Sequence, residues 1–468
     1  MRRNMRLSDF LRKFERDRGR KPRIGFIGLG ISNRALLEDA AGYPMTLRGS
    51  ARIDQLPPSK LYPELTVHTG ERALEDIEED ILLLSPSVRR DAPELIRAAM
   101  RGVVFTSDAE LFFLDNSEHT YAVSGSDGKS TTATMMHLLL KEKHPRAELL
   151  GNIGTPFADS CSDVAVAELS SFQLEYMRPR VRSAVLTPIT ENHLDWHADL
   201  DEYLEAKLNL FAHAGRRVCT PDTPLSALIT EGCTCDVIYS ARFSLSELSR
   251  HYAADHYMTL EEGYVMLDGQ MLLPVSICGR REPHNIHNLM GAVGATLGDC
   301  SREHILSVAA SFRGLEHRIE RFLSVAGADF INSSIDTTPS RTARTLTSLD
   351  RPVRLILGGR GKRLSLVPCF EPILRYATRI SLYGDAGKEY YPVLKKRGIT
   401  ELIECQLFER LAEATEHATT DLCEGDTVLL SPAATGYGEF RDFADRGRFF
   451  KKYILDKYKT QICERTKK

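Results

Sequence analysis

Short apolar runs of strand length recur along this chain, and longer amphipathic stretches lie between them. Many of the runs end in Gly, Ser or Pro, which is typical of a strand that leads into a loop. The runs are residues 23–28, 80–86, 102–107, 121–125, 164–169, 183–189, 353–359, 379–384 and 426–432. Strand periods that alternate with helical periods indicate parallel sheets joined by crossover helices, so we predict an α/β fold.

The order of these runs divides the 468 residues into three blocks. At roughly 150 residues per domain, the length also suggests about three domains. We predict domains at residues 1–107, 108–314 and 315–468. Residues 1–22 form a basic extension, which we interpret as a solvated helix rather than a membrane anchor. Shorter alternating runs over 240–282 predict a small antiparallel excursion.

The composition argues against several classes of protein. A formal net charge of −3 does not suggest a general binder of nucleic acids or membrane surfaces. No apolar run approaches the roughly 20 residues that span a bilayer, and the basic start lacks the apolar core of a signal peptide. Of the 10 cysteines, only Cys233 and Cys235 lie close together, so free thiols are the default expectation. We therefore expect a cytoplasmic protein with no nucleic-acid partner and no membrane insertion.

The segment YAVSGSDGKSTTATMMHLLL predicts a strand, a glycine-rich turn and a helix. Gly125 and Gly128 let backbone N–H groups approach phosphate oxygens, and Lys129 supplies positive charge. Ser130 or Thr131 can offer a hydroxyl to Mg²⁺. A plain strand–helix turn is the less favoured interpretation, because all these features coincide. The spacing GxxGK is shorter than the common GxxxxGK[ST], which indicates a subset of ATP-using enzymes rather than motors or GTPases.

Two further segments present candidate metal ligands after later strands. Glu168 follows the run VAVA, where a carboxylate can hold Mg²⁺ opposite the loop hydroxyls. An acid before a helix is the less favoured interpretation of Glu168. His193, in TENHLDWH, can ligate a second Mg²⁺ or orient a phosphate. Lys207 lies in DEYLEAKLNLF and, by composition alone, is an exposed helix lysine.

Nine motifs now stand in an order that resembles the Mur ligases, over nearly the whole chain after residue 23. They are GSDGKSTT, GNIGTPF, ELSSFQLE, TENHLDWH, AKLNLF, HNIHN, GLEHRIE, LGGRGK and LLSPAATGYGEF. The combination of GNIGTPF with ELSSFQLE resembles the branch of that family that adds D-glutamate.

The resemblance implies a fold and a reaction. It implies a Rossmann-like N-terminal domain for a UDP-sugar, a P-loop-type central ATPase domain with a parallel sheet, and a Rossmann-like C-terminal domain for an amino acid. The implied reaction transfers the γ-phosphate of ATP to the L-alanyl carboxylate of UDP-N-acetylmuramoyl-L-alanine, and the amine of D-glutamate then attacks the acyl phosphate. The implied enzyme is a monomer that uses two Mg²⁺ ions and acts in the synthesis of peptidoglycan precursors.

The resemblance also assigns roles to residues at matching positions. Lys129, His193 and Lys207 match catalytic residues, and Lys207 matches the lysine that the family carbamylates. A carbamate would turn this cation into an anionic ligand. The implied metal ligands are Ser130, Glu168, His193 and Lys207. The implied ATP contacts are Gly125, Ser126, Asp127, Gly128, Lys129, Ser130, Thr131, Asn285, Asn288 and Arg318.

The remaining matches concern the other two substrates. The turn in GFIGLGISN suits a diphosphate at a helix N-terminus, although Asn33 occupies the third glycine position of GxGxxG. The implied UDP-sugar contacts are Gly28, Leu29, Ile31, Ser32, Arg48 and Asn152. Arg48 would contact the uracil, and a surface arginine is an equally favoured interpretation. The implied amino-acid contacts are Thr337, Lys362, Thr435 and Phe443.

The third domain departs from the family pattern. Ser333 stands where an aspartate is usual, Ile335 where many members have lysine, and Gly436 where a serine often contacts the amino acid. Asp336 is not an equivalent replacement, because it lies three residues further on. In the phosphate loop, Asp127 replaces a common asparagine. Two alternatives therefore stay open: a Mur-type ligase for another amino acid, and a non-catalytic paralogue that binds nucleotide or UDP-sugar.

Overall fold

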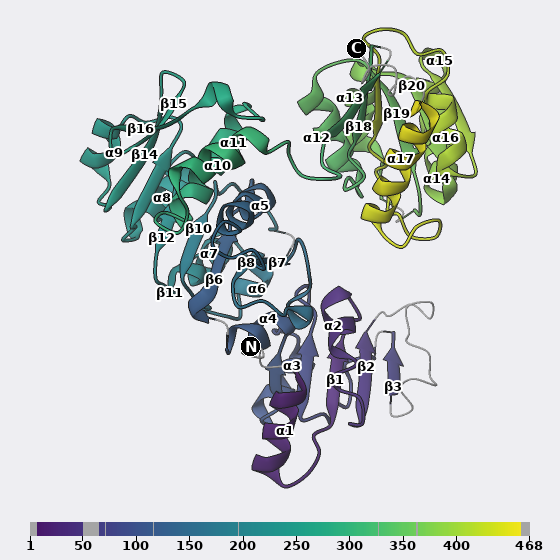
Figure 1. Cartoon of the computed structure of the whole chain (residues 1–468). Coiled ribbons are helices and arrows are strands. Elements are labelled where there is room, and N and C mark those ends of the chain that lie inside the picture. Colours follow the sequence, from purple (N-terminus) through teal and green to yellow (C-terminus); the bar gives the residue numbers. More distant parts are fainter. Residues whose placement is uncertain are drawn as a thin grey trace. The chain divides into compact units, whose positions relative to one another are not determined.

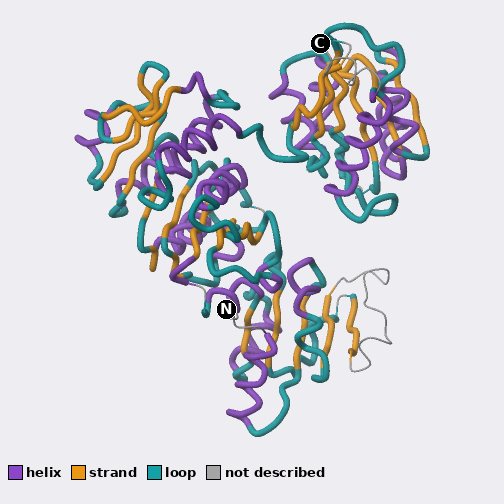
Figure 2. Tube along the Cα trace, viewed as in Figure 1, coloured by secondary structure: helices purple, strands orange, loops and turns teal. Residues whose placement is uncertain are grey.

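The computed structural model describes residues 7–49, 65–70, 72–115, 117–194, 196–325, 327–361 and 364–459. The chain forms two compact units, Met1–Phe312 (the first unit) and Arg313–Lys468 (the second unit) (Figure 1). Helices flank largely parallel sheets in both units, which confirms the predicted α/β class (Figure 2). The three-domain boundaries at 107 and 314 stay a prediction.

The first unit begins with a sheet that is parallel throughout, in the order β3-β2-β1-β4-β5. Its strands are β1 (Ile24–Ile27), β2 (Met45–Gly49), β3 (Leu65–Thr69), β4 (Ile81–Leu84) and β5 (Val104–Thr106). Its helices are α1 (Leu7–Arg18), α2 (Ile31–Leu36), α3 (Pro93–Met100) and α4 (Asp108–Phe113). The strand order is Rossmann-like, and the direction of winding reverses between β1 and β4, where such sheets bind ligands.

The basic helix α1 is not wholly solvated. Leu7 and Leu11 are fully buried in the core of this first sheet, and Phe10 and Phe14 pack against that core. These four residues recur at the spacing that places apolar side chains on one face of a helix. The helix is therefore confirmed, but its predicted full solvation is wrong.

A second sheet of 9 strands follows, in the order β16-β15-β14-β13-β12-β10-β6-β8-β7. Its strands are β6 (Thr120–Ser124), β7 (Glu148–Gly151), β8 (Ala165–Glu168), β10 (Ser183–Leu186), β12 (Arg217–Cys219), β13 (Val237–Ser240), β14 (His256–Glu261), β15 (Tyr264–Leu267) and β16 (Gln270–Pro274). Only β14–β15 and β15–β16 pair antiparallel in this sheet, which confirms the excursion predicted over 240–282.

Helices and short elements surround this second sheet. The helices are α5 (Lys129–Leu140), α6 (Ser171–Leu174), α7 (Leu200–Leu208), α8 (Pro224–Gly232), α9 (Leu245–His251), α10 (Pro283–Ala295) and α11 (Arg302–Ser311). The 3₁₀ turns are η2 (Ser117–His119), η3 (Phe157–Asp159), η4 (Asn209–Phe211) and η5 (Val275–Ile277), and the ribbon strands are β9 (Arg180–Val181) and β11 (His213–Ala214). Helices α5 and α10 pack against each other, so the phosphate-loop helix is supported by the helix that carries HNIHN.

The second unit contains a sheet of 6 strands, in the order β17-β18-β22-β19-β20-β21. Its strands are β17 (Glu320–Val325), β18 (Ala328–Asn332), β19 (Val353–Gly358), β20 (Ala377–Tyr383), β21 (Glu404–Phe408) and β22 (Thr427–Leu430). Its helices are α12 (Pro339–Leu349), α13 (Phe370–Tyr376), α14 (Gly384–Lys396), α15 (Ile399–Leu402), α16 (Leu411–Ala418) and α17 (Phe443–Lys457), with the 3₁₀ turn η6 (Val367–Cys369). Only the edge pair β17–β18 is antiparallel.

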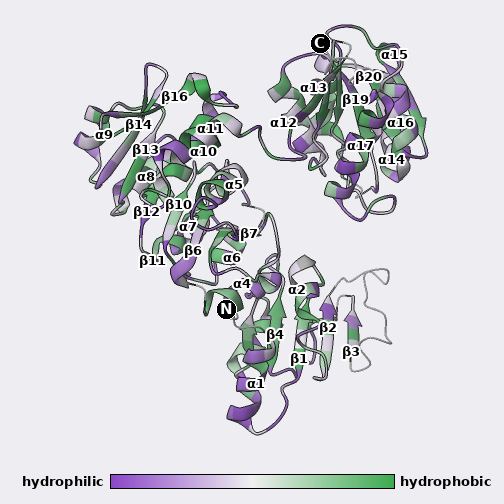
Figure 3. Ribbon diagram, in the orientation of Figure 1, coloured by the Kyte–Doolittle hydropathy of each residue, from purple (hydrophilic) through white to green (hydrophobic). Residues whose placement is uncertain are grey.

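All nine predicted runs coincide with strands, namely β1, β4, β5, β6, β8, β10, β19, β20 and β22. Many of these strands are hydrophobic along their length (Figure 3), as expected for parallel strands covered on both faces. Among the residues that the structure describes, no helix has the length and apolarity that a bilayer crossing requires.

Candidate functional site

The loop between β6 and α5 adopts a backbone that demands glycine at two positions. Gly125 has φ 139° and Gly128 has φ 85°, a region that other residues rarely enter. A Cβ atom at Gly125 would lie 2.0 Å from Thr187 Oγ1, and one at Gly128 would lie 2.2 Å from Asn288 Oδ1. Both glycines predicted for phosphate binding are therefore fixed by steric contact with β10 and α10 as well as by backbone conformation.

The same loop ends at the uncapped N-terminus of a 12-residue helix. Gly128 is the N-cap of α5 and supplies no side-chain hydrogen bond. The first N–H groups of a helix have no partner within the helix, and the helix dipole makes this end positive. The amides of Lys129, Ser130 and Thr131 lie at this helix end, where anions bind favourably, and their contact with ATP stays a prediction.

Ser126 anchors this loop to the rest of the second sheet. Its hydroxyl oxygen lies 2.7 Å from Tyr203 OH, accepts from the amide of Thr190 and donates to the carbonyl of Thr190. The neighbouring Asp127 is exposed. An acid at this position thus faces solvent, which reduces its repulsion of a bound triphosphate.

Two lysines approach the loop from different elements. Lys129 Nζ donates to the carbonyl of Ser126 at 2.9 Å. Lys207 Nζ, from α7, donates to the carbonyl of Gly125 at 2.7 Å and lies over the ring of Tyr203. Lys207 is only 2% exposed, so the prediction of an exposed helix lysine from composition is wrong. Burial lowers the pKa of Lys207 well below its ordinary value, and the nearby charge of Lys129 lowers it further.

Glu168 ends β8 in a buried position. Its side chain is 4% exposed, and its Oε2 has no hydrogen-bond partner within the described part of the chain. A buried carboxylate oxygen without a partner is costly, and a cation would satisfy it. The amide of Asn152 donates to the carbonyl of Glu168 at 3.1 Å, so the predicted sugar contact Asn152 lies beside the predicted metal ligand.

His193 belongs to the loop that follows β10. Its backbone is left-handed, with φ 57°, and its exposed ring packs edge-on against Phe172 at 5.0 Å between centroids. On α10, Asn285 donates to Glu282 at 3.1 Å, whereas Asn288 faces the phosphate loop at Gly128. The structure therefore brings Asn288 next to the loop, while Asn285 is held by a neighbour on its own helix.

A second candidate binding loop follows β1. Gly28 has φ 77°, and a Cβ there would lie 2.9 Å from Ser85 Oγ. Asn33 was noted only as a departure from the glycine pattern, yet it is fully buried. Its Nδ2 donates to the carbonyls of Gly28 (2.7 Å) and Leu83 (3.2 Å) and lies 3.3 Å from Ser85 Oγ. Asn33 therefore links the carboxyl ends of β1 and β4, between which the direction of winding of the sheet reverses.

Asp108 is a further residue that the motifs did not indicate. It is almost fully buried at the start of α4, and Ser32 of the β1 loop donates to it. Burial raises the pKa of Asp108 to about 6. Leu29 of the same loop is also buried, and α2 begins at Ile31. The predicted UDP contact Ser32 is thus positioned by a buried carboxyl from a later helix.

Arg48 is buried, and its guanidinium binds groups of the first unit. Its side chain and that of Glu79 are each 3% exposed, and Arg48 Nε donates to Glu79 Oε1 at 2.7 Å. Its terminal nitrogens donate to the carbonyls of Ala73, Glu75 and Asp76. Neither interpretation made from the sequence fits, because the guanidinium is neither on the surface nor directed to an open site. The expected contact with uracil is not supported.

The amino-acid residues predicted from the resemblance lie in the second unit. Thr435 donates to the carbonyl of Arg360 at 3.2 Å. Phe443 begins α17, and its ring is partly exposed beside His317 at 6.1 Å between centroids. Thr337 is half-buried in the segment before α12. Lys362 lies outside the described residues.

Two of the three departures in this unit, Gly436 and Ser333, have structural reasons or roles. A Cβ at Gly436 would lie 2.5 Å from the carbonyl oxygen of Asp442, so a serine does not fit this backbone. Ser333 is buried and accepts from the amide of Ile319. Asp336 is also buried, and it accepts from Thr345 and Ser431. Asp336 therefore acts inside the unit and does not replace the missing aspartate.

Arg446 is a buried residue of α17 that sequence reasoning did not single out. It donates to both the hydroxyl and the carbonyl of Ser334 at 2.8 Å and to the carbonyl of Ala434 at 2.9 Å. A Cβ at Gly359 would lie 2.9 Å from its guanidinium. Arg446 thus joins the segments that follow β18, β19 and β22. Arg318 also belongs to this unit, and its contact with nucleotide stays a prediction.

Comparisons with known proteins agree with this arrangement. Residues 123–296 match the model of the Mur ligase middle domain. Over 449 residues, the chain is 30% identical to UDP-N-acetylmuramoylalanine–D-glutamate ligase of Clostridium tetani, covering 92% of this chain and 96% of the relative. Over 470 residues, it is 31% identical to the ligase of the same name from Ruminiclostridium cellulolyticum, covering 96% of this chain and 99% of the relative.

A solved structure shares the fold. The UDP-N-acetylmuramate–alanine ligase of Thermotoga maritima superposes with a TM-score of 0.54 at 17% identity, covering 93% of this chain and 100% of the other. At that identity the likeness concerns the fold alone.

Proposed function

This chain belongs to the Mur ligase family, and on that premise we propose that it adds D-glutamate to UDP-N-acetylmuramoyl-L-alanine with cleavage of ATP to ADP and phosphate. Support for the amino acid comes from the two near-full-length relatives that carry this activity in their names. Support for ATP comes from the phosphate loop. We propose the same three domains as before, at residues 1–107, 108–314 and 315–468, for UDP-sugar, ATP and amino acid.

One observation carries the proposal: two lysines lie near the carboxyl end of one strand, and the adjacent strand ends in a buried carboxylate whose Oε2 has no hydrogen-bond partner in the described part of the chain. Lys129 and Lys207 both bind carbonyls of the phosphate loop after β6, and Glu168 ends the adjacent strand β8. A γ-phosphate and a substrate carboxylate repel each other, so their approach requires positive charge that is already in place. We propose that Lys129 contacts the γ-phosphate during its transfer.

The residues fit a divalent ion with oxygen ligands. The buried Oε2 of Glu168 has no other partner within the described residues, and carboxylate and hydroxyl oxygens suit Mg²⁺. Glu168 and Ser130 would hold one ion, and His193 with a carbamylated Lys207 would hold a second. Bound Mg²⁺ would neutralise charge between the triphosphate and the carboxylate.

Carbamylation of Lys207 is consistent with its surroundings. A neutral amine is the form that adds CO₂, and both burial and the charge of Lys129 favour the neutral form of Lys207. Its position beside the carbonyl of Gly125 would bring a carbamate next to the phosphate loop. We propose that this group is a metal ligand rather than a base.

The remaining parts of the proposal concern substrates and setting. The UDP moiety would bind at the β1 loop through Gly28, Leu29, Ile31 and Ser32, with Asn152 near the reacting carboxylate. D-Glutamate would bind through Thr337, Lys362, Thr435 and Phe443, and its amine would attack an acyl phosphate. Arg318, Asn285 and Asn288 would contact ATP. We propose a cytoplasmic monomer that acts in peptidoglycan precursor synthesis.

The test measures phosphate release by the full chain with UDP-N-acetylmuramoyl-L-alanine, ATP and Mg²⁺. D-Glutamate, L-glutamate, L-alanine and meso-diaminopimelate are compared as acceptors. We expect release with D-glutamate alone. Lys129→Ala should abolish it, because the γ-phosphate loses its nearest cation. Lys207→Ala should cripple it, with partial rescue by short-chain carboxylic acids that replace a carbamate.

Each alternative predicts a different result. Release with another amino acid only would identify a Mur-type ligase of different specificity. Release with none, despite measurable nucleotide binding, would identify the non-catalytic paralogue. Full activity of Lys129→Ala would contradict the assignment of the phosphate loop.

A further inference from the structure

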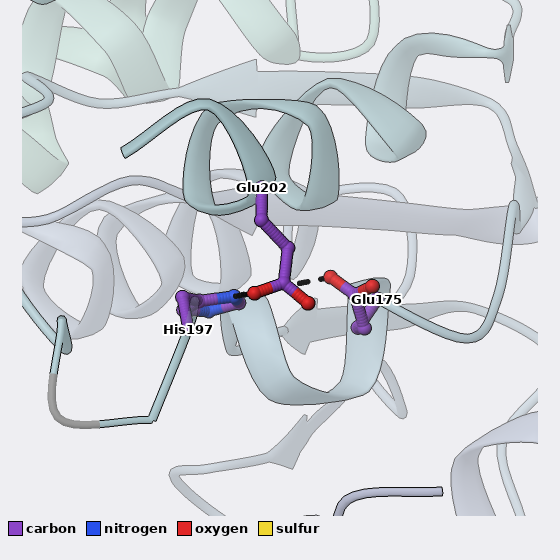
Figure 4. A group of neighbouring side chains, drawn as sticks. All are labelled: Glu175, His197 and Glu202. Carbon is purple, nitrogen blue, oxygen red and sulfur yellow. Dashed lines mark ion pairs between the residues drawn. The ribbon is translucent and has the colours of Figure 1, made fainter. Parts of the chain in front are cut away.

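Three side chains that are not assigned to ATP or Mg²⁺ form a cluster (Figure 4). Glu175 follows α6, His197 precedes α7, and Glu202 is in the first turn of α7. One ligand atom from each lies within 4.8 Å of those from the other two. The two carboxylates point toward the same side of the imidazole ring (Figure 4). Three segments thus converge with a ligand set of one nitrogen and two oxygens.

The cluster contains a buried imidazole, that of His197. The His197 side chain is 0% exposed, and its Nε2 lies 2.9 Å from Ser171 Oγ. Its Nδ1 is a buried nitrogen without a hydrogen-bond partner in the described chain. Nδ1 faces Oε2 of Glu175 at 3.9 Å and Oε2 of Glu202 at 3.8 Å, both too far for a hydrogen bond.

The neutral imidazole and the two carboxylates of this cluster together favour the binding of a cation. Burial lowers the pKa of His197 and so favours its neutral form. In the tautomer that carries its proton on Nε2 and donates it to Ser171, the lone pair of Nδ1 faces two carboxylates. Burial and the charge of Glu202 together raise the pKa of Glu175, against a smaller opposing effect of the nearby Arg89. Metal-bound histidines characteristically donate from their other ring nitrogen to an oxygen, and Ser171 Oγ lies 2.9 Å from Nε2 of His197.

We propose that Glu175 Oε2, His197 Nδ1 and Glu202 Oε2 bind a divalent transition-metal cation. One imidazole with two carboxylates suits such ions. Ligands about 2.1 Å from a common ion lie about 3.0–3.4 Å from one another, so the His197–carboxylate pairs need to close by less than about 1 Å. Water would complete the coordination, because Glu175 is 21% exposed.

The neighbouring cation Arg89 leaves room for this ion. Arg89 Nη2 binds Oε1 of Glu202 at 3.0 Å, which is not the oxygen that faces His197. Oε2 of Glu202 accepts from the amide of Ala198 and, at 3.3 Å, from Arg89 Nη1. The long contact from Arg89 Nη1 is the one that a metal ion would replace.

A metal ion bound to this cluster would hold together three segments next to the proposed active site. The loop that ends at His197 also carries His193, and α7 carries both Glu202 and Lys207. A single ion would therefore tie the His193 loop to the helix of Lys207 and to the segment after α6. Its role would be to position these elements, because none of its ligands is assigned to ATP or to Mg²⁺.

The experiment titrates Mn²⁺ into the chelator-treated full chain without nucleotide and follows free Mn²⁺ by electron paramagnetic resonance. Mn²⁺ is the chosen probe because it prefers oxygen and nitrogen to the thiols of this cysteine-containing chain. We expect one tight site in the wild type that survives in Glu168→Gln, which alters the proposed Mg²⁺ site. Glu175→Gln should weaken binding at least tenfold. Glu205→Gln, the same change on an exposed residue of α7, should leave binding unchanged.

A spectroscopic measurement identifies the nitrogen ligand. Mn²⁺ bound to the double variant Glu168→Gln/His193→Gln should still show coupling to an imidazole nitrogen, which only His197 would then supply within the cluster. Glu175→Gln is nearly isosteric and partly exposed, so it should keep the fold, and its melting temperature without metal checks this. Absence of a nucleotide-free site in the wild type would overturn the proposal. Equal affinity of the wild type and Glu175→Gln, or loss of the site in Glu168→Gln, would also overturn it. None of these outcomes depends on ligase activity.

Discussion

Gly128 shows how one residue can combine a backbone requirement with a contact at the site. Its φ is 85°, and a Cβ would lie 2.2 Å from Asn288 Oδ1. Gly102 has φ 86° but nothing within 4 Å of its Cβ position. Alanine at either position costs about 1–2 kcal/mol of left-handed strain. We expect only Gly128→Ala to weaken ATP binding, by at least tenfold, because it must displace Asn288 or the phosphate loop.

Gly102→Ala is the matched control for that prediction. Calorimetric titration measures the affinity of each variant for ATP. Thermal unfolding measures the loss of stability that left-handed strain causes in both variants. Equal ATP affinity in the two variants would show that contact with Asn288 does not constrain the loop.

Asp108 predicts a pH dependence of stability. Its pKa is about 6 in the folded chain, against an ordinary 3.8. Below pH about 4 the carboxyl is protonated in both the folded and the unfolded state, and its burial costs nothing extra. As pH rises through about 6, the folded state must hold a buried charge, at a cost of up to about 3 kcal/mol. Wild type should therefore lose stability relative to Asp108→Asn over this window.

The measurement for Asp108 compares melting temperatures of the wild type and Asp108→Asn from pH 4 to pH 7. The variant also lacks the carboxylate to which Ser32 donates. Loss of this hydrogen bond shifts the melting temperature of the variant by an amount that varies little with pH. The difference between the two curves isolates Asp108 from other titrating groups. Curves that run parallel across the whole range would contradict the raised pKa.

The strand, turn and helix around residues 121–140 were predictable because neighbouring residues determine them. Gly125, Gly128 and Lys129 follow one another along the chain, so their spacing alone indicates a phosphate loop. The environment of Arg48 depends on Glu79, which is 31 residues away, and no local pattern indicates that ion pair. The burial of Lys207 and the convergence of Glu175, His197 and Glu202 likewise depend on tertiary packing of separate segments.

At the scale of an element, the burial of helix α1 also depends on tertiary packing. Its charged composition suggested full solvation, yet Leu7 and Leu11 are fully buried. Leu11→Ala should lower the free energy of unfolding of the first unit by about 2–5 kcal/mol, since a core leucine leaves a cavity. Lys13→Ala, on the exposed face, should change it by less than about 0.5 kcal/mol. Urea unfolding checks both, and equal midpoints would show that α1 does not contribute to the core.

Strands were more predictable than helices because buried parallel strands are continuous apolar runs. β10 and β22 are buried at every position, so their sequences alone mark them. Edge strands such as β3 and β21 are largely exposed or half-buried and carry no such signal. This difference explains why all nine apolar runs are strands while other strands of the sheets were not predicted.

At the scale of the whole molecule, the chain is organised as two units with separate cores. Buried clusters around Ile24, Leu82 and Ala122 lie in the first unit, and clusters around Leu355 and Phe330 lie in the second. A unit with its own core can fold alone. We therefore expect the fragments 1–312 and 313–468 each to unfold cooperatively in urea, and the first fragment to bind ATP.

Ligase activity should require both units, because Lys129 and Lys207, which we propose act on ATP, belong to the first unit, whereas Thr337, which we propose binds D-glutamate, belongs to the second. In the intact chain, the connection between the units supplies an effective concentration of about 1 mM. Fragments mixed at about 10 µM, if their affinity is weak, should then regain only about 1% of the activity. Phosphate release with D-glutamate measures this, and raising the concentration of the second fragment should increase the rate in proportion. Full activity of fragment 1–312 alone would show that the amino acid binds without the second unit, and failure of either fragment to fold would show that the two cores depend on each other.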